Sequence, residues 1–138
     1  MPATQETRLL THAGAMQMLA AAIGRAEEIG QPQCIVIVDA SGELLAEVRM
    51  TGAKFLSRKS ARAKALTAAS IGAATTNIPE DVRPAIAAAT DGVVTGLPGG
   101  LPIRIDGVLL GGIGVGSGTG EQDIAVAEAA LSAVGAEV

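Results

Sequence analysis

The chain of 138 residues has the size of one domain, and its net charge of -4 opposes contact with nucleic-acid phosphates. A single phenylalanine, with no tryptophan or tyrosine, excludes base stacking on aromatic side chains. The only cysteine cannot form an intrachain disulfide, and no apolar run is long enough to cross a membrane. We therefore expect a cytoplasmic protein with no nucleic-acid or membrane partner.

Small side chains dominate the composition. The 27 alanines and 18 glycines make up about a third of the chain, and they predict a core in which backbones approach closely. Such a core leaves little apolar area per residue. We therefore expect a homo-oligomer, dimeric or higher, in which subunit contacts add stability.

The first half of the chain is predicted to be a helix, a hairpin and a second helix. Residues 1–10 show no pattern and read as a loose arm before a single domain over residues 11–138. Apolar residues at spacings of three and four then predict a helix over 11–29, which Gly30 and Pro32 end. Strands are predicted at 34–38 and 44–48, joined by a turn too short for a parallel crossover.

A helix over 57–72 follows, with Ser57 as its predicted N-cap. Residues 82–89 indicate a short helix, and the predicted strands are 93–95, 103–105 and 108–115. The last two strands flank Asp106-Gly107, a strong hairpin signal. A final helix begins after Thr119, where Gln122 completes a capping box. Antiparallel hairpins with helices outside them define an α+β fold.

A set of short stretches is distinctive in its order and spacing: IVIVDASG at 35–42, RMTGA at 49–53, ARAKA at 61–65, PGGLPI at 98–103, DG at 106–107, GIGV at 112–115 and EQD at 121–123. Together with the order of elements, these stretches resemble the GlcG/HbpS family of haem-degrading and haem-binding domains. The resemblance implies a profilin-like, three-layer α/β/α fold with a five-stranded antiparallel sheet, and assembly as dimers or larger oligomers. It also implies a small-ligand site near a Gly-Gly loop and a lysine-bearing helix. This chain has Thr51 where the family commonly has Asp, and its serine lies at 117 rather than 116.

Six of the ten Lys and Arg residues fall within sixteen positions, between Arg49 and Lys64. They predict an anion site near the start of the second helix, and the alternative is a solvated helix face. Lys64 differs from the others because it shares an arc with Ala61 and Ala68. A lysine on an apolar arc is desolvated, so it would serve as an anion anchor or a base, unless its stem snorkels to water.

Two glycine-rich segments are further candidates. Main-chain N–H groups of Gly99 and Gly100 could approach a ligand closely, although a plain tight turn also explains the sequence. The glycines of 111–118 are not a dinucleotide fingerprint, because their strand belongs to a hairpin; they indicate close packing on the sheet. Ser117 could touch an anionic group at the last helix, and Asp123 is added by the resemblance.

We therefore predict a domain that binds a small anionic or polar organic molecule. Arg49 and Lys64 are its expected charge partners, with Gly99, Gly100, Ser117 and Asp123 as further ligand contacts. The resemblance implies service in a catabolic pathway, since relatives occur beside glycolate-oxidation and diol-utilisation genes.

Besides a purely structural partner, which the alanine-rich helix faces favour, two other classes stay open. One is a cofactor-independent isomerase or lyase, in which Lys64 abstracts a proton and Gly99 and Gly100 cradle an oxyanion. The other is a haem or corrinoid carrier, which the resemblance alone implies. His12 is the only histidine and Tyr is absent, so the residues predict no firm haem site. No cluster of His and Cys predicts a metal site.

Overall fold

Four strands form one antiparallel sheet, which three of the four α-helices cover, and α3 (Arg83–Ala89) lies outside these layers. The computed structural model describes all of residues 1–138. The elements are α1 (His12–Glu28), β1 (Cys34–Asp39), β2 (Leu44–Arg49), α2 (Ser57–Ile71), α3 (Arg83–Ala89), β3 (Gly100–Ile105), β4 (Val108–Gly116) and α4 (Gly120–Ala133), with short 3-10 turns at Thr75–Asn77 and Glu80–Val82.

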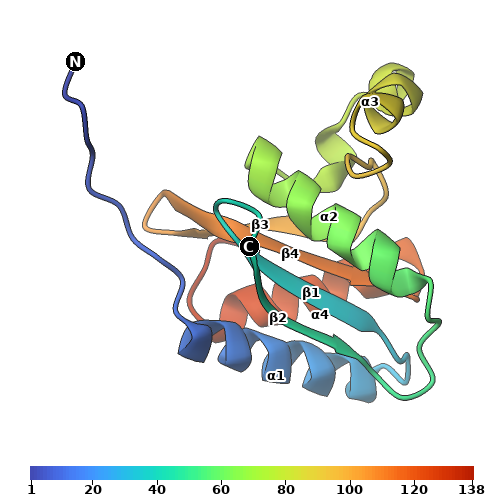
Figure 1. Ribbon diagram of the computed structural model, residues 1–138. Coiled ribbons are helices and arrows are strands. Elements are labelled where there is room, and N and C mark those ends of the chain that lie inside the picture. Colours follow the sequence, from blue (N-terminus) through green and yellow to red (C-terminus); the bar gives the residue numbers. More distant parts are fainter.

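The strands lie side by side in the order β2-β1-β4-β3. Helix α2 covers one face of the sheet, and α1 and α4 lie together against the other, so the molecule has three layers (Figure 1). Cys34 is paired with Arg49 on one side and with Gly116 on the other. Gly100 pairs with Gly114. These pairings bring Arg49, Gly116 and Gly100 to the same end of the sheet.

The sheet has four strands, and the prediction of a fifth is wrong. Residues 93–95 form no strand. The Thr67 hydroxyl, on α2, donates to the Val93 carbonyl and accepts from the Thr95 N–H. This side chain therefore satisfies two of the backbone groups that a strand would offer to a neighbour, and Thr90 accepts the N–H groups of Val93 and Val94.

Helix α2 packs on β4 through backbones rather than side chains. A Cβ on Gly114 would collide with the Ala61 carbonyl and lie 2.5 Å from the Ala65 nitrogen. Gly112 meets the next turn of the helix, at Ala65 and Ala69, in the same way. This close approach is possible because glycine occupies alternate positions of β4 and alanine occupies every fourth position of α2. The predicted close packing at these glycines is confirmed.

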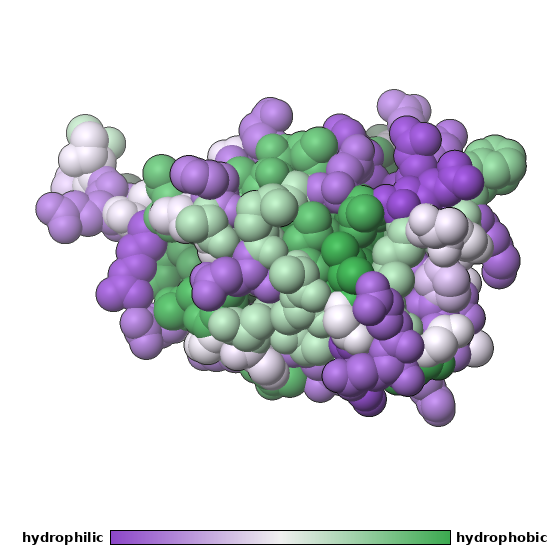
Figure 2. Space-filling view, turned by 90° about the horizontal axis from the view of Figure 1, so that it is seen from below, coloured by the Kyte–Doolittle hydropathy of each residue, from purple (hydrophilic) through white to green (hydrophobic).

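The larger core lies on the opposite face of the sheet. Met18 on α1, Ile35 and Ile37 on β1, and Val126 and Leu131 on α4 are fully or almost fully buried there. Seen from this side, apolar surface remains between the polar groups of the two helices (Figure 2). None of the helices has the length and apolar character that a membrane crossing requires.

The helix ends agree only in part with the sequence. Thr119 and Gln122 form the predicted capping box. The predicted cap at Ser57 is wrong, because the N-cap is Leu56 and the first N–H groups of α2 donate to the carbonyls of 54–56. The start of α2 is thus closed by its own chain and offers no free N–H groups to an anion.

The segment before α1 is extended but is attached to the body of the domain at Arg8 and Leu10. Residues before α1 run as an extended segment away from the body (Figure 1). Leu10 is nevertheless buried in the core, and Arg8 pairs with Asp106 at 2.8 Å. Asp106 and Gly107 both have positive φ, as the predicted hairpin turn requires.

Candidate functional site

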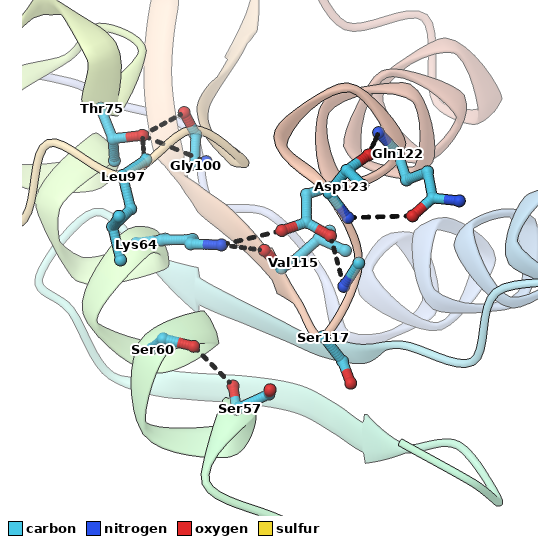
Figure 3. Close-up of polar contacts among 12 residues, drawn as sticks. Ser57, Ser60, Lys64, Thr75, Leu97, Gly100, Val115, Ser117, Gln122 and Asp123 are labelled. Atoms are coloured by element: carbon cyan, nitrogen blue, oxygen red, sulfur yellow. Dashed lines mark hydrogen bonds and ion pairs between the residues drawn. The ribbon is translucent and has the colours of Figure 1, made fainter. Parts of the chain in front are cut away.

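Lys64 points inward from α2 and ends in a buried ion pair. Its Nζ donates to the Val115 carbonyl at 2.7 Å and lies 3.0 Å from Oδ2 of Asp123 (Figure 3). Only 5% of the Lys64 side chain and 4% of the Asp123 side chain are exposed. The predicted desolvation of Lys64 is confirmed, and a carboxylate of the chain itself balances its charge.

The same ammonium meets the glycine corner, as predicted. A Cβ on Gly99 would lie 3.2 Å from Lys64 Nζ and 2.7 Å from the Val115 carbonyl oxygen. Gly99 has φ +113, and its carbonyl accepts the Val115 N–H. The Lys64 ammonium therefore binds the Val115 carbonyl beside Gly99, directly before the start of β3.

Of the two predicted main-chain N–H donors at this corner, one has a hydrogen-bond partner within the chain and the other has none. The Gly100 N–H donates to Thr75 Oγ1 at 3.3 Å, and the Thr75 hydroxyl also contacts the carbonyls of Leu97 and Gly100 (Figure 3). Gly100 belongs to β3 rather than to the preceding loop. The Gly99 N–H donates to no other group of the chain. Of the two predicted donors, Gly99 alone is unused.

Asp123 joins this corner to the start of α4. Its Oδ1 accepts the Gly118 N–H at 3.1 Å, while Oδ2 takes Lys64. A carboxylate in the first turn is also favoured by the positive end of the helix dipole. One buried side chain thus fixes the turn 116–119 to α2 across the end of the sheet.

Arg49 lies apart from this cluster, at the opposite edge of the sheet. Its Nε donates to the Ala53 carbonyl at 3.2 Å.

Two hollows meet at Arg49 and Val48, which line both of them. One is a groove of about 560 Å³ between β2 and the end of α1, which we call the Arg49 groove. Its lining residues are Ile23, Ala26, Glu27, Gly30, Gln31, Pro32, Val48, Arg49, Met50 and Thr51.

The second hollow, the Arg58 pocket, lies on the α2 side of β2. It measures about 240 Å³, and Cys34, Val36, Glu47, Val48, Arg49 and Arg58 line it. Burial raises the pKa of the Cys34 thiol, and Glu47 adds to this, whereas Arg49 and Arg58 oppose it. The thiol donates to the Lys54 carbonyl at 3.6 Å. Cys34 is therefore a protonated, inert thiol at neutral pH, as its place in a buried strand predicts.

Ser117 lies between the two groups of residues but faces away from the ion pair (Figure 3). Its Oγ accepts the Lys54 N–H at 3.0 Å, and its carbonyl accepts Gln31 Nε2 at 3.1 Å. Ser117 has φ +95, a conformation that few residues other than glycine adopt. It links the loop before α2 to the rim of the Arg49 groove.

The six predicted site residues thus gather at one end of the sheet but across its full width. Lys64, Asp123, Gly99 and Gly100 form one cluster; Arg49 is separate, and Ser117 lies between. The sequence missed Gln33, which is fully buried with both side-chain polar atoms unpartnered. Its position directly before a buried apolar strand was the available signal, since a polar residue there is expected to need a partner.

The antiparallel sheet with α2 on one face and α1 and α4 on the other makes this an α+β domain. The family model described as haem degrading protein HbpS-like matches residues 10–132. The chain belongs to that family, which confirms the resemblance found in the sequence.

Individual relatives agree with this assignment. The chain is 37% identical over 123 residues to corrinoid adenosyltransferase PduO of Citrobacter freundii. The aligned residues make up 86% of this chain but only 37% of that protein. A PduOC–haem complex superposes with a TM-score of 0.88 and 31% identity, over 94% of this chain and 98% of that one. Klebsiella pneumoniae protein ORFY gives a TM-score of 0.93 and 31% identity, over 100% and 99%.

Haem is the group that this family implies, and the residues of one chain do not fit it. His12, the only histidine, is exposed in the first turn of α1 and lines none of the five main hollows. Cys34 is buried and protonated. Met50 lines the Arg49 groove, but its sulfur already accepts the Gln33 N–H at 3.4 Å. No step of the function is therefore derived through haem.

Proposed function

We propose that this protein is a binding domain for a small organic anion, held at Arg49. The observation that carries the proposal is the position of the Arg49 side chain, which lines both the Arg49 groove and the Arg58 pocket. A guanidinium at the junction of two hollows can bind a carboxylate or phosphate while the rest of the ligand lies against apolar walls.

The charges of the two hollows decide which end of the ligand each one takes. The Arg58 pocket has two guanidinium groups against the carboxylate of Glu47, so it suits the anionic group. The Arg49 groove balances Arg49 with Glu27 and adds the apolar side chains of Ile23, Val48 and Met50. Its volume of about 560 Å³ lies within the usual range of small-molecule sites. The body of the ligand therefore belongs in the groove.

The remaining predicted residues line neither hollow, and we propose that they support the site from outside it. Lys64 is paired with Asp123, so a second anion at Lys64 would have to displace that carboxylate. We assign Lys64 and Asp123, with Gly99 and Gly100, to holding the turn 116–119, and Ser117 to carrying the rim residue Gln31. We further propose that this binding serves a catabolic pathway, as the resemblance implies.

An isomerase or lyase is the second candidate, and a specific arrangement favours it. Lys64 Nζ, the unused Gly99 N–H and the Asp123 carboxylate lie together in a buried corner. A proton-abstracting base and a main-chain donor for an oxyanion need this combination. The ion pair keeps Lys64 occupied, however, so binding at Arg49 is the function that the geometry supports best.

Binding of simple carboxylates tests the proposal. We expect butanoate to octanoate to bind, and Arg49→Gln to weaken the binding about tenfold to a hundredfold, because a charge-assisted hydrogen bond is lost. Ligand-observed NMR measures both. Arg62→Gln, an exposed arginine of α2 outside both hollows, is the matched control and should leave the affinity unchanged. Equal affinity in wild type and Arg49→Gln would refute the proposal.

We also propose that the protein self-associates through the loop before α2. Phe55, the only aromatic residue, and Leu56 beside it are each 65% exposed. Two adjacent large apolar side chains are costly to leave in water, and a partner subunit that covers them removes this cost.

A further inference from the structure

Gln33 is the buried polar side chain that the fold leaves without a partner. The other four buried polar or charged residues, Lys64, Thr67, Thr75 and Asp123, all have hydrogen bonds to their side chains. Gln33 has 0% exposure, and neither its Nε2 nor its Oε1 finds a partner. A buried amide without hydrogen bonds costs stability, so its presence calls for a role outside the packing of the chain.

The backbone of Gln33 adjoins the Arg49 groove. The Gln33 N–H donates to the sulfur of Met50, and the Gln33 carbonyl accepts the Met50 N–H. Met50, together with Gln31 and Pro32 directly before Gln33, lines the groove. Met50 is a flexible side chain that repacks readily, so a ligand that replaces its sulfur as acceptor of the Gln33 N–H could displace it and connect Gln33 with the groove.

The side chain of Gln33 adjoins the other predicted cluster. The position that a Cβ of Gly118 would take lies 2.7 Å from Gln33 Nε2 and 2.9 Å from Asp123 Oδ1. Asp123 in turn pairs with Lys64. Gln33 therefore lies between the Arg49 groove and the Lys64–Asp123 pair, which the sequence had predicted to form one site.

We propose that the Gln33 carboxamide is a ligand-binding group at the inner end of the Arg49 groove, closed off by Met50 when no ligand is bound. This inference rests on the proposed binding of an anion at Arg49. A carboxamide needs both an acceptor and a donor from its partner. The nearby Asp123 carboxylate disfavours a second negative charge. The ligand is thus an organic anion whose far end carries a neutral hydroxyl or amide.

Matched pairs of probes test this assignment. Each alkanoate from butanoate to octanoate is compared with its ω-hydroxy counterpart, because the hydroxyl both donates and accepts while the charge stays the same. We expect the best ω-hydroxy acid to bind wild type about tenfold more tightly than its alkanoate. Gln33→Met should remove this preference and keep the Arg49-dependent binding of the alkanoate.

Two further readouts separate a ligand contact from a structural role. The side-chain amide signal of Gln33 in NMR spectra should shift with the ω-hydroxy acid but not with the alkanoate. In the absence of ligand, Gln33→Met should raise the melting temperature by about 3 to 6 °C, since an unpartnered amide is removed. Gln17→Met, the same substitution on the exposed face of α1, is the matched control and should change neither property.

The outcomes distinguish the two proposals. Arg49-dependent binding without a preference for the hydroxyl, or with a preference that survives in Gln33→Met, overturns the role of Gln33 alone. A lower melting temperature in Gln33→Met also overturns it, because the amide would then be satisfied within the fold. Absence of Arg49-dependent binding to any probe overturns the proposed function and this inference together.

Discussion

Lys64 and Asp123 show how a charged residue can lie almost wholly inside a small domain. Each gives up its hydration, and each regains an opposite charge and at least one hydrogen bond to the main chain. Such a pair adds little net stability over an apolar pair of the same size, but removal of one partner leaves the other charge buried alone. The corner is therefore sensitive to single substitutions.

Lys64→Met should lower the free energy of unfolding by about 3 to 5 kcal/mol, because Asp123 is left buried without its counter-charge. The double variant Lys64→Met/Asp123→Leu should recover much of this loss. Urea denaturation measures both. Lys59→Met, on the exposed side of the same helix, should stay within about 0.5 kcal/mol of wild type. A Lys64→Met variant as stable as wild type would show that the pair is not held as described.

The sequence predicted Lys64 at the glycine corner because helical spacing places it on the alanine arc that faces the sheet. It could not predict that Arg49 lies elsewhere. Arg49 ends β2 and Gly100 begins β3, and these are the two edge strands, about 14 Å apart at ordinary strand spacing. Strand order depends on long-range pairing, which local patterns do not contain.

At the scale of elements, the contact of α2 with β4 determines the spacing between helix and sheet. Main-chain atoms meet there, so the distance is set by glycine and alanine and cannot be adjusted by rotamers. The composition of the chain predicted this directly. The strand predicted at 93–95 is absent because its backbone hydrogen bonds go to Thr67, a residue far away in the sequence, and to Thr90.

Gly114→Ala tests this contact. The added Cβ would meet the Ala61 carbonyl, so α2 must move away from the sheet, and we expect a loss of about 3 kcal/mol or more in stability. Gly24→Ala is the matched control: it lies in the interior of α1 with open space at its Cβ position. That variant should gain roughly 0.5 to 1 kcal/mol from helix propensity. Thermal denaturation of the two proteins compares them, and a Gly114→Ala variant that melts like wild type contradicts the close approach.

At the scale of the whole molecule, apolar surface remains outside both cores. Phe55 and Leu56 stand out in the loop before α2, and the lobe around α3 buries none of that helix's residues. Phe55, the only aromatic residue, therefore adds little buried apolar area to the single chain. This supports the proposed assembly, for which the single chain supplies the exposed side chains.

Phe55→Asp should therefore shift the protein toward the monomer, because a charge replaces the apolar contact of the proposed interface. Sedimentation equilibrium of wild type and variant measures the change as a fall in average mass. Leu9→Asp, in the extended segment before α1 and 80% exposed, is the matched control and should leave the mass unchanged. A wild-type protein that sediments as a monomer at all accessible concentrations would contradict the proposal.

The meeting of α2 with β4 also limits how this protein can evolve. In most cores, substitution by a larger residue can be compensated by substitution of a neighbour by a smaller one. Here Gly112 and Gly114 have no side chain to lose, and Ala61 and Ala65 have a single methyl each. No reciprocal exchange is available, so descendants that keep this architecture inherit these small residues together, while exposed charged residues of the same helix, such as Lys59 and Arg62, are free to change.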